Sequence, residues 1–209
     1  AQEGADATSL SVDPVYYDGP QGPTIFCEGA SAKGLDSNID FSSGGTFTCF
    51  AVVDKYVGVS ALFSVAVEYE RYYLGSNGWT LFFTENNNRV YVGIGAAGVY
   101  SDFYYENAAL SSGPHVYALT GDSSLAASSQ IRLWIDGKEV VPTATSGGGM
   151  AGNFAAGSVT IGGRTNGAGG LERPFNGKIQ SVLTSTSVLP DDEIIEASRL
   201  LLPRNTLSL

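Results

Sequence analysis

Positively charged residues are scarce in this sequence. Its 209 residues include 11 Lys and Arg against 21 Asp and Glu, for a formal net charge of −10. No Lys/Arg cluster occurs, and an acidic surface repels the phosphates of nucleic acids. No apolar run reaches the roughly 18 residues that a bilayer-spanning helix needs. We therefore expect no nucleic-acid partner and no membrane insertion.

Histidine and cysteine are scarce too, which limits the chemistry of the chain. His115 is the only histidine and no nucleophile motif accompanies it, so a structural role is expected. One His and two separated cysteines also lack the spacing of zinc ligands. Cys27 and Cys49 each lie in a strand-like run. They are either two buried thiols acting as small hydrophobes or a disulfide between adjacent strands.

Glycine and aromatic residues are abundant, with 27 Gly, 11 Tyr and 10 Phe. They favour many short strands and tight turns, and the length suits one all-β, antiparallel jelly-roll β-sandwich. This domain is expected over residues 35–209. Residues 1–34 are expected to form an extended N-terminal arm, because Pro14, Pro20 and Pro23 exclude it from a central sheet position. The arm would supply edge strands or reach a neighbouring subunit. The start at Ala1 fits removal of either a signal peptide or an initiator methionine.

Alternating large and polar side chains predict the strands of the second half. The alternating segments are residues 115–120, 130–140, 159–164 and 175–182. In the second segment one face holds Ile131, Leu133 and Ile135, and the other holds Gln130, Arg132 and Trp134. Asp136-Gly137 supplies the two left-handed positions of a tight hairpin turn.

Residues 47–120 are expected to form an antiparallel meander that includes a hairpin with a polar tip at 85–88. One short C-terminal helix is expected at 190–201. Pro190 fits the first helical position, and acidic residues follow at the positive end of the helix dipole. The expected apolar stripe of this helix is Ile194, Ala197 and Leu201.

Five motifs occur in a characteristic order. They are His115-Val116-Tyr117, Trp134-Ile135-Asp136-Gly137-Lys138, Ile161-Gly162-Gly163, Phe175-Asn176-Gly177-Lys178-Ile179 and Leu189-Pro190-Asp191-Asp192-Glu193-Ile194. This order resembles the laminin-G-like branch of the concanavalin A-like lectins and glucanases. Residues 47–53 are similar to the first core strand of that family, with Val52 where a Trp is usual. The resemblance covers residues 35–201 and implies a concanavalin A-like fold. It implies little about function, because these are turn and core residues.

Relatives of this fold that cleave glycans carry acids at alternate positions of one strand, beside the scissile bond. Here Glu68 and Glu70 are predicted to share a strand face, but Tyr72 occupies the third acidic position. We therefore expect no catalytic residue and no enzyme activity.

Several relatives bind calcium, and residues 36–40 carry oxygen ligands at alternate positions. Phe41 and Phe47 stand where a helix-loop-helix calcium loop needs Gly and Glu, so that motif is absent. A looser calcium site using Asp36, Asn38 or Asp102 is the alternative to solvated turn residues. No other cofactor is expected.

Aromatic residues are the strongest candidates for ligand binding. Tyr and Trp offer a flat apolar face with a polar tip, which suits sugar stacking and protein interfaces alike. Alternation places about half of them in the core. The candidate ligand-binding residues are Tyr72, Tyr73, Trp79, Tyr100, Tyr104 and Tyr105.

Two functional hypotheses remain. The first is a non-enzymatic, surface-displayed binding or structural protein, such as a decoration or appendage subunit of a phage virion. It is suggested by a composition rich in Gly, Ala, Ser, Thr and Tyr, and by the arm. The protein would be a homo-oligomer that contacts other virion subunits or a surface protein. The alternative is a secreted, extracellular lectin-like module that binds a glycan, and a glycoside hydrolase is the least favoured.

Overall fold

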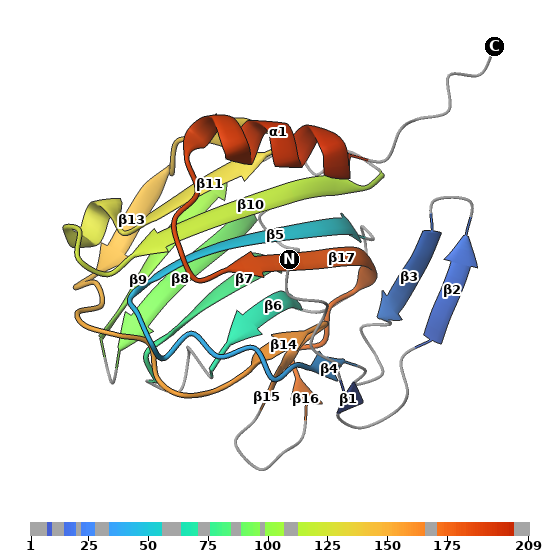
Figure 1. The fold of residues 1–209 in the computed structure, drawn as a ribbon, viewed down its shortest axis with the longest axis horizontal. Coiled ribbons are helices and arrows are strands. Elements are labelled where there is room, and N and C mark those ends of the chain that lie inside the picture. Colours follow the sequence, from blue (N-terminus) through green and yellow to red (C-terminus); the bar gives the residue numbers. More distant parts are fainter. Residues whose placement is uncertain are drawn as a thin grey trace.

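The alternating segments fold into two stacked antiparallel sheets in the computed structural model (Figure 1). The structure describes residues 8–9, 15–19, 22–27, 34–55, 64–70, 76–84, 89–96, 99–106, 113–165 and 171–202. Every strand pair among these residues is antiparallel, which confirms the predicted all-β jelly-roll sandwich. The polar tip predicted at 85–88 lies outside the described residues, although the two strands that flank it do pair.

The first sheet has eight strands. In spatial order they are β1 (Thr8–Ser9), β4 (Leu35–Asp36), β14 (Val159–Ile161), β6 (Ser64–Tyr69), β7 (Gly78–Thr84), β8 (Arg89–Ala96), β9 (Val99–Glu106) and β13 (Ala144–Gly147). The strands β6 to β9 are consecutive in both sequence and space, which confirms the middle of the meander predicted over residues 47–120. The strands at the two ends of that range, Thr46–Lys55 and His115–Asp122, instead pair with each other in the other sheet.

The second sheet has seven strands. In spatial order they are β12 (Lys138–Val140), β11 (Ile131–Ile135), β10 (His115–Asp122), β5 (Thr46–Lys55), β17 (Gly177–Ser185), β3 (Gly22–Cys27) and β2 (Val15–Gly19). A separate ribbon pairs β15 (Arg164–Thr165) with β16 (Leu171–Glu172), and a 3-10 turn spans Ala127–Ser129. Asp136 and Gly137 join β11 to β12 with φ values of 53° and 76°, the predicted left-handed turn.

Strands from the N-terminal segment lie at the sheet edges, the position that its prolines predict. β2 and β3 are the outermost strands of the seven-stranded sheet, and β1 is the outermost strand of the eight-stranded sheet. The boundary between arm and domain stays a prediction.

Large apolar side chains from the facing sides of the two sheets form the main core. Trp79 of β7 stacks on Phe47 of β5 with ring centroids 4.4 Å apart, and Phe41 meets both rings edge-on. All three residues are buried. These contacts join one sheet to the other through aromatic area rather than through backbone hydrogen bonds.

Cys49 also points into this core as a buried free thiol, and burial raises its pKa. The disulfide alternative is therefore wrong. Cys27 lies in β3 and Cys49 in β5, and β17 separates these two strands in the sheet.

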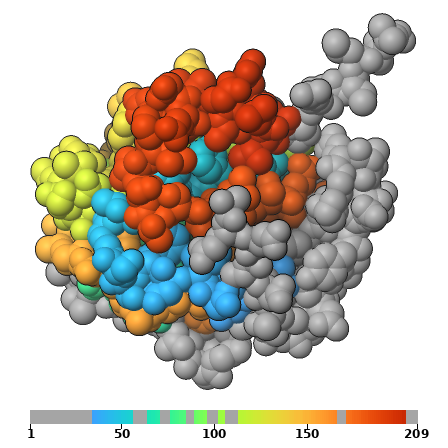
Figure 2. Space-filling model, viewed as in Figure 1, coloured from blue at the N-terminus to red at the C-terminus, as the bar shows by residue number. Residues whose placement is uncertain are grey.

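The outer face of the seven-stranded sheet carries a second apolar cluster, against which the helix α1 (Asp191–Leu201) packs. This helix, drawn in red, forms part of the surface in Figure 2. Its buried members are Phe50, Val52, Val116, Ala118, Trp134 and Ile194. Ile194 is the buried centre of the predicted helical stripe, with Ala197 and Leu201 packed beside it. Trp134 lies on the sheet face expected for it but is fully buried beneath the helix. Pro190 is the residue just before the helix rather than its first residue. Among the described residues, no helix is long and apolar enough to cross a membrane.

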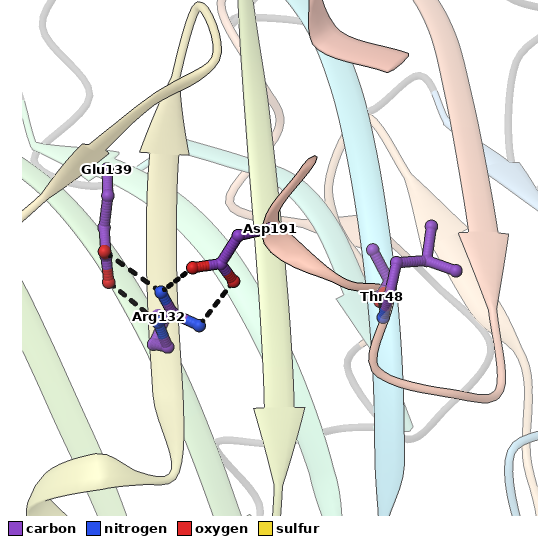
Figure 3. A network of polar contacts seen from close by, with 5 residues as sticks. Thr48, Arg132, Glu139 and Asp191 are labelled. Carbon is purple, nitrogen blue, oxygen red and sulfur yellow. Dashed lines mark hydrogen bonds and ion pairs between the residues drawn. The ribbon is translucent and has the colours of Figure 1, made fainter. Parts of the chain in front are cut away.

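Arg132 of β11 ties the start of α1 to the β11–β12 hairpin (Figure 3). Its guanidinium donates to Glu139 at 2.7 and 3.0 Å and to Asp191 at 2.8 Å twice. The same group lies 4.5 Å from the ring centroid of Trp134. Thr48 of β5 holds the loop before the helix, because its hydroxyl donates to Ser187 O and accepts from Leu189 N. The helix is therefore positioned by polar contacts at its start and by apolar packing along its length.

Asp40 joins two loops at one end of the sandwich. Its carboxylate accepts hydrogen bonds from the Ser42 backbone at 2.9 Å, the Ser42 hydroxyl at 2.8 Å and the Tyr69 hydroxyl at 2.8 Å. These bonds, that of the Ser42 backbone first, lower the pKa of Asp40 to about 2. The Tyr69 hydroxyl also bonds the carbonyl oxygen of Ala155, so the two loops share one buried phenol.

We predict that Arg132→Met lowers the free energy of unfolding by about 1–2 kcal/mol, because two partly exposed ion pairs and one cation–π contact are lost. Urea denaturation measures this. Arg199→Met is the matched control, since within the described part of the chain Arg199 pairs only with Glu196, one turn away on the exposed face of α1, and its loss should change stability little. Equal losses in the two variants would contradict the assigned role of Arg132.

We also predict an acid-sensitive contribution from Asp40. A carboxyl whose pKa is lower in the folded chain stabilises the fold above its ordinary pKa of 3.8 and loses that contribution as the pH falls toward about 2. The unfolding free energy should therefore fall less steeply between about pH 4 and pH 2 in Asp40→Asn than in the unmodified protein. Parallel curves would show that the carboxylate is not held as described.

Candidate functional site

Three aromatic side chains form a row on the outer face of the eight-stranded sheet, the face turned away from the other sheet. Phe82 of β7 is opposite Tyr91 of β8, and Tyr91 is opposite Tyr104 of β9. We call Phe82, Tyr91 and Tyr104 the ring row. All three are half-buried.

The sequence produces the ring row by strict alternation. Each ring has a fully buried core residue on both sides in the chain, and these neighbours point to the opposite face. The buried neighbours are Leu81 and Phe83, Val90 and Val92, and Phe103 and Tyr105. A shift of one residue in any of the three strands would therefore bury its ring and expose core residues.

The rings contact one another across the strands. The centroids of Phe82 and Tyr91 are 4.7 Å apart with the planes 12° from parallel, and those of Tyr91 and Tyr104 are 5.7 Å apart at 36°. Arg89 lies beside them, with its guanidinium carbon 4.6 Å from the centroid of Tyr104 and one nitrogen donating to the Tyr91 hydroxyl at 3.3 Å. Cross-strand aromatic and cation–π contacts of this kind contribute about 0.5–1.5 kcal/mol each. The row is therefore held in a defined geometry before any ligand arrives.

A second row, of mostly polar residues, runs parallel to the rings on the same face. In β7, β8 and β9 it lies two residues away from the ring along the strand. In register order its members are Asp36, Thr160, Glu68, Thr80, Gly93, Asp102 and Ser146. We call this set the polar row, and it lies about 7 Å from the ring row, which is two strand residues. Glu68, Thr80 and Thr160 are buried, whereas Asp102 is half-buried and Ser146 exposed. The accessible polar groups beside the rings are thus those at the β9–β13 side.

The predicted ligand-binding residues divide between this face and the core. Tyr104 belongs to the ring row. Trp79 and Tyr105 are fully buried in the core, so the prediction that they bind a ligand is corrected. Tyr105 alternates with Tyr104 on the same strand, and its burial raises the pKa of its hydroxyl. Tyr72, Tyr73 and the side chain of Tyr100 lie outside what the structure describes.

Phe82, Tyr91 and Arg89 were not predicted from the sequence as site residues. The signal that would have found them is the hairpin itself. With residues 85–88 as its tip, Thr84 is opposite Arg89 and Phe82 opposite Tyr91. Counting back from the tip therefore places two aromatic residues side by side.

The structure separates the residues of the predicted calcium site. Asp36 is in β4 and Asp102 in β9, and five strand spacings of about 4.8 Å put them about 24 Å apart, so one ion cannot bind both. The Asp36 carboxylate accepts from the hydroxyls of Ser158 at 2.7 Å and Thr160 at 3.4 Å, and Asn38 is exposed. Across the described ranges, no three His, Cys, Asp or Glu residues form a group suited to a metal. Calcium binding stays a prediction.

The acids at 68 and 70 do not alternate as predicted. Glu68 is inside β6 and 2% exposed, whereas Glu70 follows the strand with a left-handed φ of 42°. The Glu70 carboxylate lies against Gly157, where an added Cβ would come within 2.5 Å of it. The chain thus leaves the strand conformation before the position at which a second acid would share the face of Glu68.

His115 forms part of a turn rather than of a reactive pair. Its Nδ1 lies 2.7 Å from Asp136 Oδ2, and Asp136 Oδ1 accepts from the backbone N–H of Val116. The Asp136 backbone N–H in turn donates to Val116 O. These bonds attach the β11–β12 turn to the first residues of β10.

A family model described as the concanavalin A-like lectin/glucanases superfamily matches residues 30–195. No curated protein sequence matches the chain.

Solved structures share the fold at low sequence identity. The Ruminococcus gnavus IT-sialidase CBM40 bound to alpha2,3 sialyllactose is 18% identical with a TM-score of 0.58, covering 84% of this chain and 97% of that one. The botulinum neurotoxin serotype G binding domain is 9% identical with a TM-score of 0.67, covering 95% of this chain and 47% of that one. A heptameric SAP-like pentraxin from Limulus polyphemus is 10% identical with a TM-score of 0.53, covering 74% and 70%. At these identities the likeness establishes the fold alone.

We predict that Trp79→Ala lowers the free energy of unfolding by about 3–5 kcal/mol, because a fully buried indole leaves a large cavity. Tyr104→Ala removes a half-buried ring on the outer face and should cost about 1 kcal/mol. Urea denaturation of the two variants measures the difference. A larger loss for Tyr104 would contradict the assignment of Trp79 to the core and Tyr104 to the surface.

Proposed function

This chain belongs to the concanavalin A-like lectin/glucanase superfamily, and we propose that it is a non-catalytic module that binds a carbohydrate through the ring row. The observation that carries the proposal is the set of three contiguous, half-buried rings held in register by β7, β8 and β9. The site would be displayed on an extracellular protein or particle.

The chemistry of the ring row suits a sugar. A pyranose ring presents an apolar C–H face that stacks on an aromatic side chain, with hydroxyl groups around its rim. The half-buried rings together supply an apolar surface, and Asp102 and Ser146 lie beside it in the neighbouring polar row. The Tyr91 and Tyr104 hydroxyls add polar tips to the rings. Rings that already contact one another lose little freedom on binding.

The described acids favour binding over cleavage. A retaining glycosidase places two carboxyl groups about 5 Å apart and an inverting one about 6.5–9.5 Å apart. On the outer face, Glu68 is separated from Asp36 by one strand and from Asp102 by two strands, and Glu68 is buried. The relatives named above include a carbohydrate-binding module bound to sialyllactose. The other hypothesis, a homo-oligomeric subunit of a virion, stays a prediction, and light scattering of the purified protein tests its oligomeric part.

We predict that Tyr91→Ala weakens glycan binding about 10-fold or more, because Tyr91 contacts both other rings and loses its stacking area. A glycan array with and without calcium identifies the ligand, and calorimetry measures the affinity. Leu183→Ala is the matched control, since this half-exposed side chain lies on β17 in the other sheet and should leave the affinity unchanged. An array that is silent in both conditions would defeat the proposal. Unchanged affinity in Tyr91→Ala would place the site elsewhere.

A further inference from the structure

We infer that the glycan stacks on one particular surface of the ring row, the face of Tyr104 that is turned toward β13, and that the small side chain of Ala144 keeps this face open. The inference rests on the proposed function and deepens it. Its basis is the strand register, which fixes the neighbour of the ring row at each end.

The ring row has a different neighbour at each end. Val65 of β6 is opposite Phe82, and Ala144 of β13 is opposite Tyr104. Residues directly opposite in antiparallel strands share a face, so both neighbours lie on the outer face with the rings. Val65 is 4% exposed, whereas Ala144 is half-buried and belongs to the outermost strand of the sheet. The row is therefore closed beside β6 and open beside β13.

The contacts between the rings decide which ring faces a ligand can use. Phe82 and Tyr91 are stacked with their planes 12° from parallel, so each ring covers part of one face of the other. Tyr104 is contacted by Tyr91, with centroids 5.7 Å apart, and by Arg89, whose guanidinium carbon lies 4.6 Å from the ring centroid. Because both contacts come from β8, they occupy the face of Tyr104 that is turned toward that strand. The opposite face is turned toward β13 and Ala144.

The size of Ala144 is what leaves that face accessible. Directly opposite residues of an antiparallel pair have Cβ atoms about 4.5–5.5 Å apart. The Ala144 side chain ends at its Cβ, so it leaves room beside the Tyr104 ring that an aromatic or long aliphatic side chain would fill. The backbone N–H of Thr143 donates to Tyr104 O at 2.9 Å, and this bond helps to hold β13 in register with β9.

A pyranose ring suits this space. Its C–H face would stack on the Tyr104 ring, with Ala144 beside it and the polar row two residues along the strand. Since β13 is the outermost strand, the rest of the glycan extends past the edge of the sheet rather than over β6. Ala144 is thus a specificity-determining residue, because its size admits a sugar to the face of Tyr104.

Ala144→Leu tests the inference, because the branched side chain fills the space beside Tyr104. With a glycan that the unmodified protein binds on an array, calorimetry should show binding weakened about 10-fold or more. Ala144→Ser keeps the side chain small and should bind within about 2-fold of the unmodified protein. Unweakened binding by Ala144→Leu, or an equal loss in Ala144→Ser, would overturn the inference.

Thr145→Leu is the matched control for the larger side chain. Thr145 is exposed, follows Ala144 on β13 and is opposite the core residue Phe103, so its side chain points to the other face of the sheet. The affinity should therefore stay unchanged. Equal losses in Thr145→Leu and Ala144→Leu would overturn the assignment to the outer face.

A second measurement does not depend on how well the Leu variant folds. In a chain that carries Cys27→Ser, the substitution Ala144→Cys adds a thiol at the proposed site, while Cys49 stays buried in the core. A saturating amount of the same glycan should slow alkylation of the introduced thiol several-fold, because the bound sugar covers it. An unchanged rate of alkylation would overturn the inference.

The outcomes separate the inference from the proposed function. Weakened binding in Tyr91→Ala together with full binding in Ala144→Leu would overturn the inference and leave the proposed function intact, because the glycan would then contact the ring row away from β13. If the unmodified protein binds no glycan on the array, the proposed function fails and the inference fails with it.

Discussion

The register of strands β7, β8 and β9 is the constraint on which the rest of this structure depends. Because side chains alternate at every residue, one pairing scheme sends Trp79, Leu81 and Phe83 inward and sends Phe82 and its partners outward. The same hydrogen-bonded ladder therefore builds the core and the ring row together. A substitution that preserves the core also preserves the spacing of the rings, so the site needs no separate scaffold.

The two sheets differ in what covers their outer faces. The seven-stranded sheet carries a second apolar cluster that must be buried, and α1 covers it with Ile194 at the centre. Arg132 fixes the start of that helix to the sheet through Glu139 and Asp191. The outer face of the eight-stranded sheet instead holds half-buried rings with polar groups beside them. This difference is the physical reason for locating the proposed function on the outer face of the eight-stranded sheet.

The family includes both lectins and glucanases, so membership alone leaves binding and cleavage open. The described side chains favour binding. Glu68 is buried and Glu70 turns out of the strand at a left-handed residue, whereas the rings are ordered by mutual contacts.

The sequence by itself determined the fold class, the Asp136-Gly137 turn and the helix with Ile194 inward, because these follow from local alternation, turn chemistry and the apolar stripe of the helix. The order of its motifs also carried the resemblance to the family. The aromatic residues predicted to bind a ligand included Tyr104 of the ring row but neither Phe82 nor Tyr91. Only the tertiary structure decided which aromatic residues are accessible. Whether Trp79 or Tyr105 lies on the inner or the outer face of its sheet depends on how each strand packs against the opposite sheet. It likewise decided that Asp36 and Asp102 lie far apart and that Trp134 lies beneath a helix. Strand order is set by packing between segments that are distant in the sequence, so it cannot be inferred from the alternation within one segment.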